Sequence, residues 1–114
     1  MKTVIYNKLV RDRIPEYIKR KGIVSETSII PNNKRLPLLL AKLTEEADEA
    51  TTAKPEKLAE ELADILEVIE AIASHANIAW EQISEIKKQK NEERGGFNNG
   101  IFLISTTEQD KTNE

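Results

Sequence analysis

A single Lys54-Pro55 step divides the centre of this chain into two amphipathic segments, and it constrains the fold more than any other feature. Proline cannot continue a helix from its N-terminal side, but it suits the first turn of a new helix. The sequence therefore predicts one helix over residues 37–53 and a second over residues 55–75. Because so short a connection leaves room only for a tight reversal, we expect the two helices to run antiparallel.

Shorter elements are expected on both sides of this pair. Pro15 can open a short helix that Gly22 ends, and a turn follows at Pro31. Asn77 is a candidate N-cap for a third helix over residues 78–91. The fold class predicted is an all-α bundle.

The end of the chain divides into two parts. Residues 97–104 contain a short apolar stretch that we expect to dock on the bundle. Residues 105–114 carry almost no apolar side chains and are expected to form a disordered tail. The prediction is one helical domain over residues 1–104, followed by this tail.

Composition excludes several classes of protein. The chain has 114 residues and no cysteine, which excludes a disulfide scaffold and a cysteine-ligated zinc site. A net charge of -3 gives no positive field for a nucleic-acid polymer. No apolar run suits a membrane span or a signal peptide. We therefore expect a cytoplasmic protein without a membrane partner.

The first long segment turns two carboxylates toward its apolar side when residues are placed about 100° apart. Glu46 falls inside the edge of the apolar stripe, and Glu49 flanks it. Asp48 points to the opposite side, and Glu45 lies between the border and solvent. The stripe consists of Leu39, Leu40, Leu43, Ala47 and Ala50.

The second long segment repeats this pattern. Glu61 falls within the apolar face and Asp64 at its edge, whereas Glu60, Glu67 and Glu70 project away. The stripe consists of Leu58, Leu62, Ile65, Leu66, Ile69 and Ile72. Apolar residues cover more of this helix than one neighbour can bury, so we expect a second copy of the chain to cover the remainder.

Four inward carboxylates, Glu46, Glu49, Glu61 and Asp64, predict a divalent-metal site. Converging carboxylates repel one another, and burying them without a partner is costly. Oxygen ligands suit a hard cation such as Mg²⁺, Mn²⁺ or Ca²⁺, and bundle metal sites are commonly built from facing helices. The site can hold one ion or two.

A simpler interpretation is that these groups form a solvated surface. Lys42 would then pair with Glu46, and Lys57 with Glu61, in ordinary i, i+4 bridges. One acidic pair would favour that interpretation. Two pairs on adjacent helices, both displaced into apolar stripes, favour the metal site.

The carboxylate pattern resembles that of a known family. Glu45-Glu46-x-x-Glu49 followed by Glu61-x-x-Asp64 is similar to the EExxE…ExxD signature of the MazG-like, all-α nucleoside triphosphate pyrophosphohydrolases. The opening YNKLVRDRIP, residues 6–15, and Arg94-Gly95-Gly96-Phe97 resemble the phosphoribosyl-ATP pyrophosphohydrolase-like subgroup. The gap between the two acidic pairs is toward the short end of the family's range.

This resemblance implies a magnesium-dependent enzyme that cleaves a nucleotide between the α- and β-phosphates. The products would be a nucleoside monophosphate and pyrophosphate, and the working form a homodimer or homotetramer. The metal ligands implied are the four inward carboxylates, with Mn²⁺ as an alternative to Mg²⁺. One of the glutamates, or Glu45 beside them, would accept the proton of the attacking water.

A polyphosphate also requires cations. Lys90 lies on the inward side of the third predicted helix and Lys87 near it. These two lysines and Arg94 are candidate phosphate ligands, although long lysine stems also reach solvent from such positions. The resemblance makes Lys8, Arg11 and Arg13 a second candidate set. His75, near a helix end, is expected to be a cap or surface residue, and Trp80 a core or interface residue.

Two other interpretations compete with the hydrolase, and the hydrolase itself has two candidate substrates. A non-catalytic helical dimerisation module could keep the fold, and it would show no magnesium dependence. A di-iron bundle usually needs Glu-x-x-His motifs, and the single histidine does not provide one. Within the hydrolase interpretation, the substrate is either phosphoribosyl-ATP or a surplus or non-standard nucleotide. The lack of a fused partner domain favours the second, housecleaning role.

Overall fold

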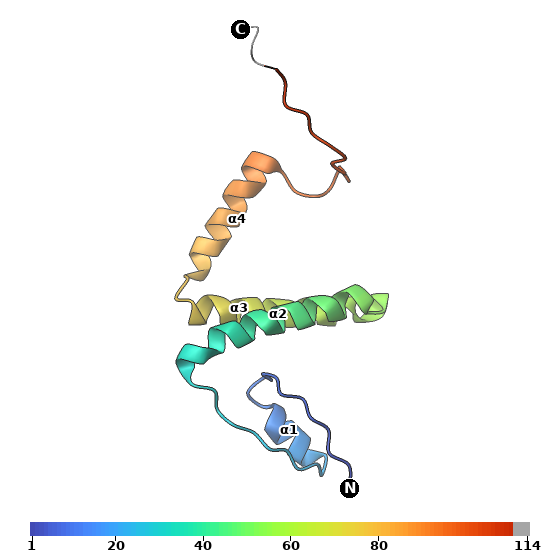
Figure 1. The fold of residues 1–114 in the computed structure, drawn as a ribbon, viewed down its shortest axis with the longest axis vertical. Helices are drawn as coiled ribbons and strands as arrows, with labels where there is room; N and C mark the ends of the chain where they lie inside the picture. Colours follow the sequence, from blue (N-terminus) through green and yellow to red (C-terminus); the bar gives the residue numbers. More distant parts are fainter. Residues whose placement is uncertain (111–114) are drawn as a thin grey trace.

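The computed structural model describes residues 1–110, and within that range the chain is all-helical without a strand (Figure 1). The α-helices are α1 (Ile14–Arg20), α2 (Arg35–Thr52), α3 (Leu58–His75) and α4 (Trp80–Arg94). Two 3₁₀ turns, η1 (Asn32–Lys34) and η2 (Pro55–Lys57), precede α2 and α3. The predicted all-α class is confirmed.

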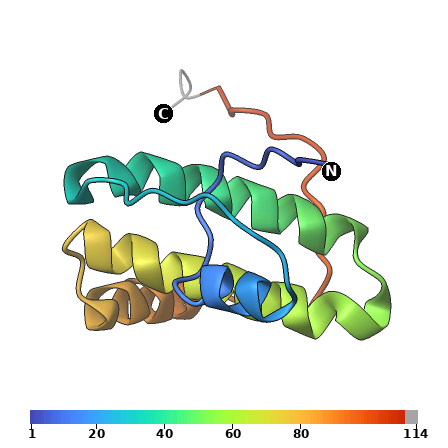
Figure 2. The ribbon, with the colours of Figure 1, turned by 90° about the horizontal axis from the view of Figure 1, so that it is seen from below.

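The two central helices form a hairpin at the middle of the molecule. Helices α2 and α3 lie side by side and run in opposite directions (Figures 1 and 2). Ala53 and Lys54 adopt extended conformations, with ψ of 147° and 150°. For Lys54 the reason is that the α region is disfavoured directly before a proline. The break and the reversal were predicted, and the second helix differs only in opening with the 3₁₀ turn at Pro55.

The junction between α3 and α4 differs from the prediction. Asn77 does not cap α4, which begins at Trp80 after Ala79 in the N-cap position. Asn77 instead has φ of 57°, with hydrogen bonds from Asn77 N to Ser74 O (3.2 Å) and from Ile78 N to Ala73 O (2.9 Å). This pair of bonds is a Schellman motif, in which asparagine replaces the usual glycine in the left-handed position. Asn77 therefore ends α3.

The flanking segments leave the hairpin on opposite sides. The N-terminal residues and α1 lie on one side, and α4 with the C-terminal segment extends away on the other (Figure 1). Phe97 and residues 101–104 have exposed fractions of 75% or more, so docking on the bundle is wrong for the single chain. Residues 105–110 are exposed and form no helix, whereas the rest of the predicted tail, residues 111–114, lies outside the described residues.

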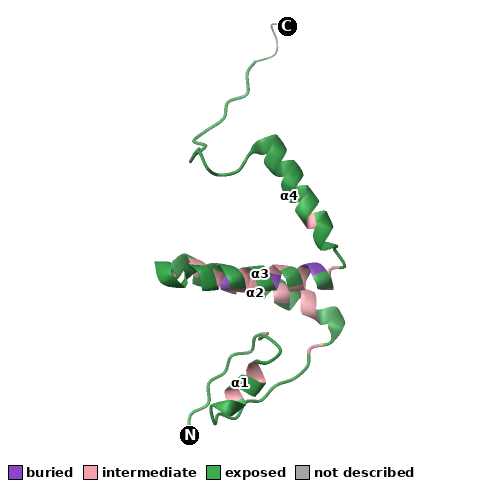
Figure 3. Cartoon of the chain, turned by 180° about the vertical axis from the view of Figure 1, so that it is seen from behind, coloured by how far each residue is buried: buried purple, intermediate pink, exposed green. Residues whose placement is uncertain are grey.

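Very little of the chain is buried. Among residues 1–110, only Glu46, Val68 and Ala73 are buried, and all three lie in the hairpin (Figure 3). Leu58, Leu62 and Leu66 form a stripe on α3 that is 41–54% exposed. The radius of gyration is 20.7 Å, whereas a compact domain of this length has about 13 Å. None of the described helices is long and apolar enough to cross a membrane.

Candidate metal centre and its cationic rim

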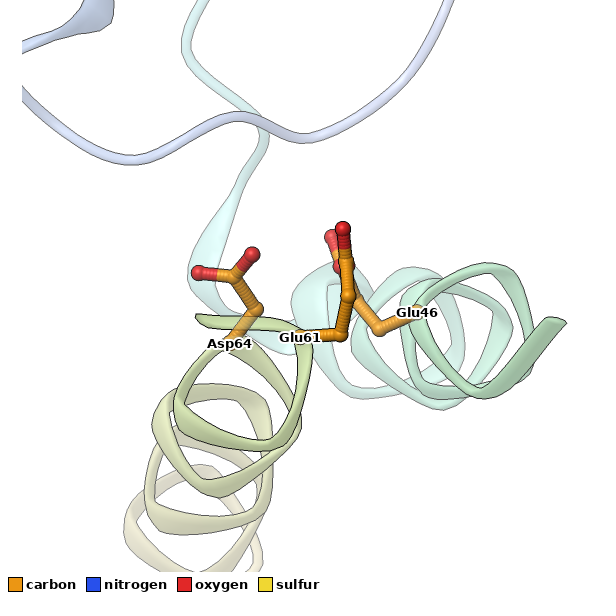
Figure 4. Close-up of side chains that lie close together, drawn as sticks. All are labelled: Glu46, Glu61 and Asp64. Carbon is orange, nitrogen blue, oxygen red and sulfur yellow. The ribbon is translucent and has the colours of Figure 1, made fainter. Parts of the chain in front are cut away.

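Three carboxylates from the two central helices converge near the middle of the hairpin. Glu46 comes from α2, and Glu61 and Asp64 come from α3, one turn apart. One oxygen from each lies within 4.8 Å of the others. Figure 4 shows all three side chains pointing to the same side of the hairpin, toward the N-terminal segment that passes there.

Glu46 is the most buried charged residue of the cluster. It is only 7% exposed, because its position on α2 faces α3. Its Oε1 lies 3.3 Å from Lys42 Nζ, but its Oε2 is buried without a hydrogen-bond partner among residues 1–110. Burial, together with the neighbouring Glu49 carboxyl, raises the pKa of Glu46 above its usual value. An ion at the free oxygen would remove this cost.

Glu61 supplies the second unpartnered oxygen. Its Oε2 is also buried without a hydrogen-bond partner in the described part of the chain. The predicted alternative bridge from Lys57 to Glu61 is wrong, since Lys57 Nζ lies 3.4 Å from Glu60 Oε2 on the outer side. The alternative bridge from Lys42 to Glu46 does form, but it uses only one of the two oxygens. Ordinary surface bridges therefore do not satisfy the cluster.

The fourth predicted ligand occupies a different environment. Glu49 is exposed and does not belong to the group of three whose oxygens converge. It nevertheless lies near enough to Glu46 to raise the pKa of that carboxyl. Asp48 and Glu70 are exposed, as the helical wheel predicts.

Two cations of the N-terminal segment lie at the rim of the cluster. Lys8 Nζ donates to Glu45 Oε1 at 2.9 Å, and Arg11 Nη2 donates to Asp64 Oδ1 at 2.7 Å. Arg11 also reaches Glu67, with Nη1 3.7 Å from Oε1. The Lys8–Glu45 hydrogen bond raises the pKa of the lysine and lowers that of the glutamate. Residues 8–11 are called the strap from here on.

Two further residues, Lys42 and Glu67, contact the groups of the site in ways that the sequence did not reveal. Lys42, 16% exposed, bridges Glu45 and Glu46 at 3.5 and 3.3 Å, so it is a part of the site and not only a surface partner. Glu67 does project outward along α3, but it meets Arg11 there. The i, i+4 spacing predicted the contact between Lys42 and Glu46, whereas no local pattern could predict the contact between Arg11 and Glu67.

The other candidate cations do not meet the carboxylates within one chain. Arg13 is the N-cap residue of α1 and is exposed. Lys87, Lys90 and Arg94 are exposed on α4, which extends away from the hairpin (Figure 1). His75 is the last residue of α3, and its Nδ1 lies 2.9 Å from Ala71 O. It thus sits at a helix end, as predicted, and Trp80 begins α4 with 42% of its surface exposed.

The donor set fits a hard divalent cation. All three converging groups are carboxylates, the ligand type that Mg²⁺, Mn²⁺ and Ca²⁺ prefer. Octahedral Mg²⁺ with ligands at about 2.1 Å holds oxygens about 3.0 Å apart when adjacent and about 4.2 Å apart when opposite. Small side-chain rotations would bring oxygens that lie within 4.8 Å to these separations. The two unpartnered oxygens would then coordinate the cation.

The fold and the site together define a class of protein: an all-helical protein whose central hairpin carries a carboxylate cluster that could bind a metal ion. The family model described as phosphoribosyl-ATP pyrophosphohydrolase matches residues 18–91, and the chain belongs to this family. The family is part of the MazG-like nucleoside triphosphate pyrophosphohydrolase superfamily. The match includes all three clustered carboxylates but not the strap. No curated protein and no solved structure gives a significant match.

Proposed function

We propose that this protein is a magnesium-dependent nucleotide pyrophosphohydrolase that cleaves between the α- and β-phosphates and releases a nucleoside monophosphate and pyrophosphate. The observation that carries the proposal is the pair of buried, unpartnered oxygens of Glu46 and Glu61, which belong to two of the three carboxylates that converge with Asp64. Membership of the family supports the reaction class.

The residues of the cluster have separate roles in this proposal. Glu46, Glu61 and Asp64 hold the cation, which when bound lowers the pKa of a water and neutralises phosphate charge. Lys42 fixes Glu46 by binding its other oxygen, because an amine 16% exposed between two carboxylates has little freedom to move. Glu49 is the fourth acidic group, at the solvent side of Glu46.

Glu49 is also the better candidate for accepting the proton of the attacking water. Glu45 accepts hydrogen bonds from two lysines, at 2.9 and 3.5 Å, and its lowered pKa makes it a weaker base. Glu49 is exposed and has no such ion pair within residues 1–110. A general base needs a free oxygen near the water that it deprotonates.

We also propose that the active form is a homodimer or homotetramer. The chain exposes 10991 Å², whereas a compact protein of 12.9 kDa exposes about 6,300 Å². The excess is several times the roughly 800 Å² that each partner buries in a standard interface. The stripe of Leu58, Leu62 and Leu66 would meet a second copy, which can also bring Lys87, Lys90 and Arg94 of its α4 toward the site.

The substrate proposed is a surplus or non-standard nucleoside triphosphate, and phosphoribosyl-ATP is the second candidate. The family's own description, phosphoribosyl-ATP pyrophosphohydrolase, supports the second candidate. A panel of ribo- and deoxyribonucleoside triphosphates and phosphoribosyl-ATP, incubated with Mg²⁺, would separate the two. Pyrophosphate and orthophosphate should be measured separately.

Release of pyrophosphate with Mg²⁺, and its loss in excess chelator, is the expected result. Orthophosphate as the first product would contradict cleavage between the α- and β-phosphates. No hydrolysis of any substrate in the panel, with the protein folded and Mg²⁺ present, would favour the non-catalytic helical module.

A further inference from the structure

The strap provides two cations to the carboxylate centre in different ways. Lys8 binds Glu45, which is not one of the three converging carboxylates, whereas Arg11 binds Asp64, which is. Arg11 therefore holds a group that a metal ion would also need. The contact spans 53 residues of sequence, so it depends on the fold of the chain and not on a local helix pattern.

Exposure separates Lys42, which stays at the centre, from Arg11, which can leave it. The Lys42 side chain is 16% exposed and lies between two carboxylates, so it has no route to another partner. The Arg11 side chain is 55% exposed and that of Asp64 is 40% exposed. An exposed ion pair is weak, and water or another ion can replace either member.

The side-chain cations around the centre do not balance its negative charge. Six carboxylates (Glu45, Glu46, Glu49, Glu61, Asp64 and Glu67) face three cations (Lys8, Arg11 and Lys42), which leaves three negative charges when all groups are ionised. A divalent ion bound at Asp64 would repel the Arg11 guanidinium and compete for its carboxylate. The displaced guanidinium, still on the strap beside the site, then has a free fork of donors for a phosphate.

We propose that Arg11 is an exchangeable ligand: it neutralises Asp64 in the metal-free protein, and it transfers to the pyrophosphate portion of the nucleotide when a divalent cation takes Asp64. This inference rests on the proposed function and adds to it a residue for the leaving group. The strap thereby makes metal and pyrophosphate binding cooperative, because metal binding frees the cation that pyrophosphate needs.

The test is a pair of calorimetric titrations on the full chain, first with Mn²⁺ alone and then with inorganic pyrophosphate added to the Mn²⁺-loaded protein. In Arg11→Ala, Mn²⁺ should bind about two- to fivefold more tightly than in the wild type, because the competing ion pair is gone. Pyrophosphate should bind about tenfold more weakly, because a charged hydrogen-bond donor is lost. Lys19→Ala, on the exposed side of α1, removes the same charge away from the cluster and should change neither titration.

Arg11→Lys separates the exchange from a simple change of charge. Lysine keeps the charge but cannot reach two acceptors with a planar fork, so both affinities should fall between those of the wild type and Arg11→Ala. Wild-type behaviour of Arg11→Lys in both titrations, or unchanged Mn²⁺ affinity in Arg11→Ala, would overturn the exchange while leaving the metal site intact. Absence of Mn²⁺ binding to the wild type would instead overturn the proposed function itself.

Discussion

The two faces of the α2–α3 hairpin differ in chemistry: one is acidic and the other is apolar. On one face, Glu46, Glu61 and Asp64 converge, and distant segments of the same chain supply cations to the rim. On the other, Leu62 and Leu66 lie roughly opposite Asp64 around α3 and are 49% and 54% exposed. The acidic face is thus largely complete within one chain, whereas the apolar face is where we propose that a second copy binds.

We expect this difference to separate the activity proposed for the protein from its assembly. Charges on the acidic face are balanced by named contacts, each of modest strength because it is partly exposed. The apolar face offers a much larger gain, about 25 cal/mol for each Å² removed from water. Substitutions on the two faces should therefore separate chemistry from assembly.

The largest effect is expected from neutralising the acidic face. Glu46→Gln or Glu61→Gln should lower nucleotide hydrolysis by at least about a hundredfold, since even outer partners of metal ligands cost 10–100-fold. Both variants should fold as well as the wild type, because glutamine removes a buried charge and keeps the shape. Steady-state pyrophosphate release measures the first effect and circular dichroism the second.

The controls for this test lie on the outer sides of the same helices. Asp48→Asn and Glu70→Gln remove equal charge at exposed positions and should keep nearly full activity. If the control variants lose as much hydrolytic activity as the inward variants, the inward carboxylates have no special role and the prediction is wrong.

Substitutions on the apolar face, away from the carboxylates, are expected to have a large effect on assembly. The double substitution Leu62→Glu and Leu66→Glu should weaken self-association by about a hundredfold or more, since each leucine buried in an interface contributes roughly 1.5–3 kcal/mol. Sedimentation of wild type and variant at tens of micromolar measures the shift. Thr44→Glu, exposed on α2, is the control for added charge. A strictly monomeric wild type would contradict the interface.

A smaller effect should connect the acidic face to stability. Mg²⁺ at about a hundred times its dissociation constant should stabilise the wild type by about 2.7 kcal/mol. This corresponds to a rise in melting temperature of roughly ten degrees or more for a chain of this size. Glu46→Gln should lose most of that rise, and Asp48→Asn should retain it. A rise that persists unchanged in Glu46→Gln would place the ion elsewhere.

The smallest effect concerns pH in the absence of metal. The pKa of Glu46 is raised in the folded protein, so the folded state binds a proton more readily than the unfolded state. Its contribution to stability is therefore present below the ordinary value of 4.5 and is lost as the pH rises through the folded pKa. In chelator, the melting temperature of Glu46→Gln should gain on that of the wild type as the pH rises above 4.5. A difference independent of pH would contradict this linkage.

Local patterns were enough to predict the hairpin and the inward direction of Glu46 and Glu61, whereas Glu49, also predicted to point inward, is exposed. Glu46 and Glu61 were placed correctly because helical periodicity and one proline fix both helices and the faces that they bury. Asn77 was misassigned because asparagine suits both an N-cap and a left-handed C-terminal turn, and only the neighbouring hydrogen bonds distinguish the two.

Long-range contacts were beyond such patterns. The Arg11–Asp64 pair joins residues 53 positions apart, and its geometry depends on the path of a segment without regular structure. The family resemblance suggested that the strap matters, but it did not indicate which carboxylate each cation meets. The direction of α4, and hence the separation of Lys87 and Lys90 from the cluster, likewise depends on a turn and not on periodicity.

The short connection at Lys54-Pro55 also has a consequence for the order of folding. All three converging carboxylates lie within one helical hairpin, between residues 46 and 64, so closing the loop that joins them costs little chain entropy. Contacts that are local in sequence form early and fast, whereas the strap must close a loop of 53 residues to reach Asp64. If the centre binds a cation as proposed, and that cation is present while the chain folds, we expect the hairpin to take it up before Arg11 of the strap reaches Asp64.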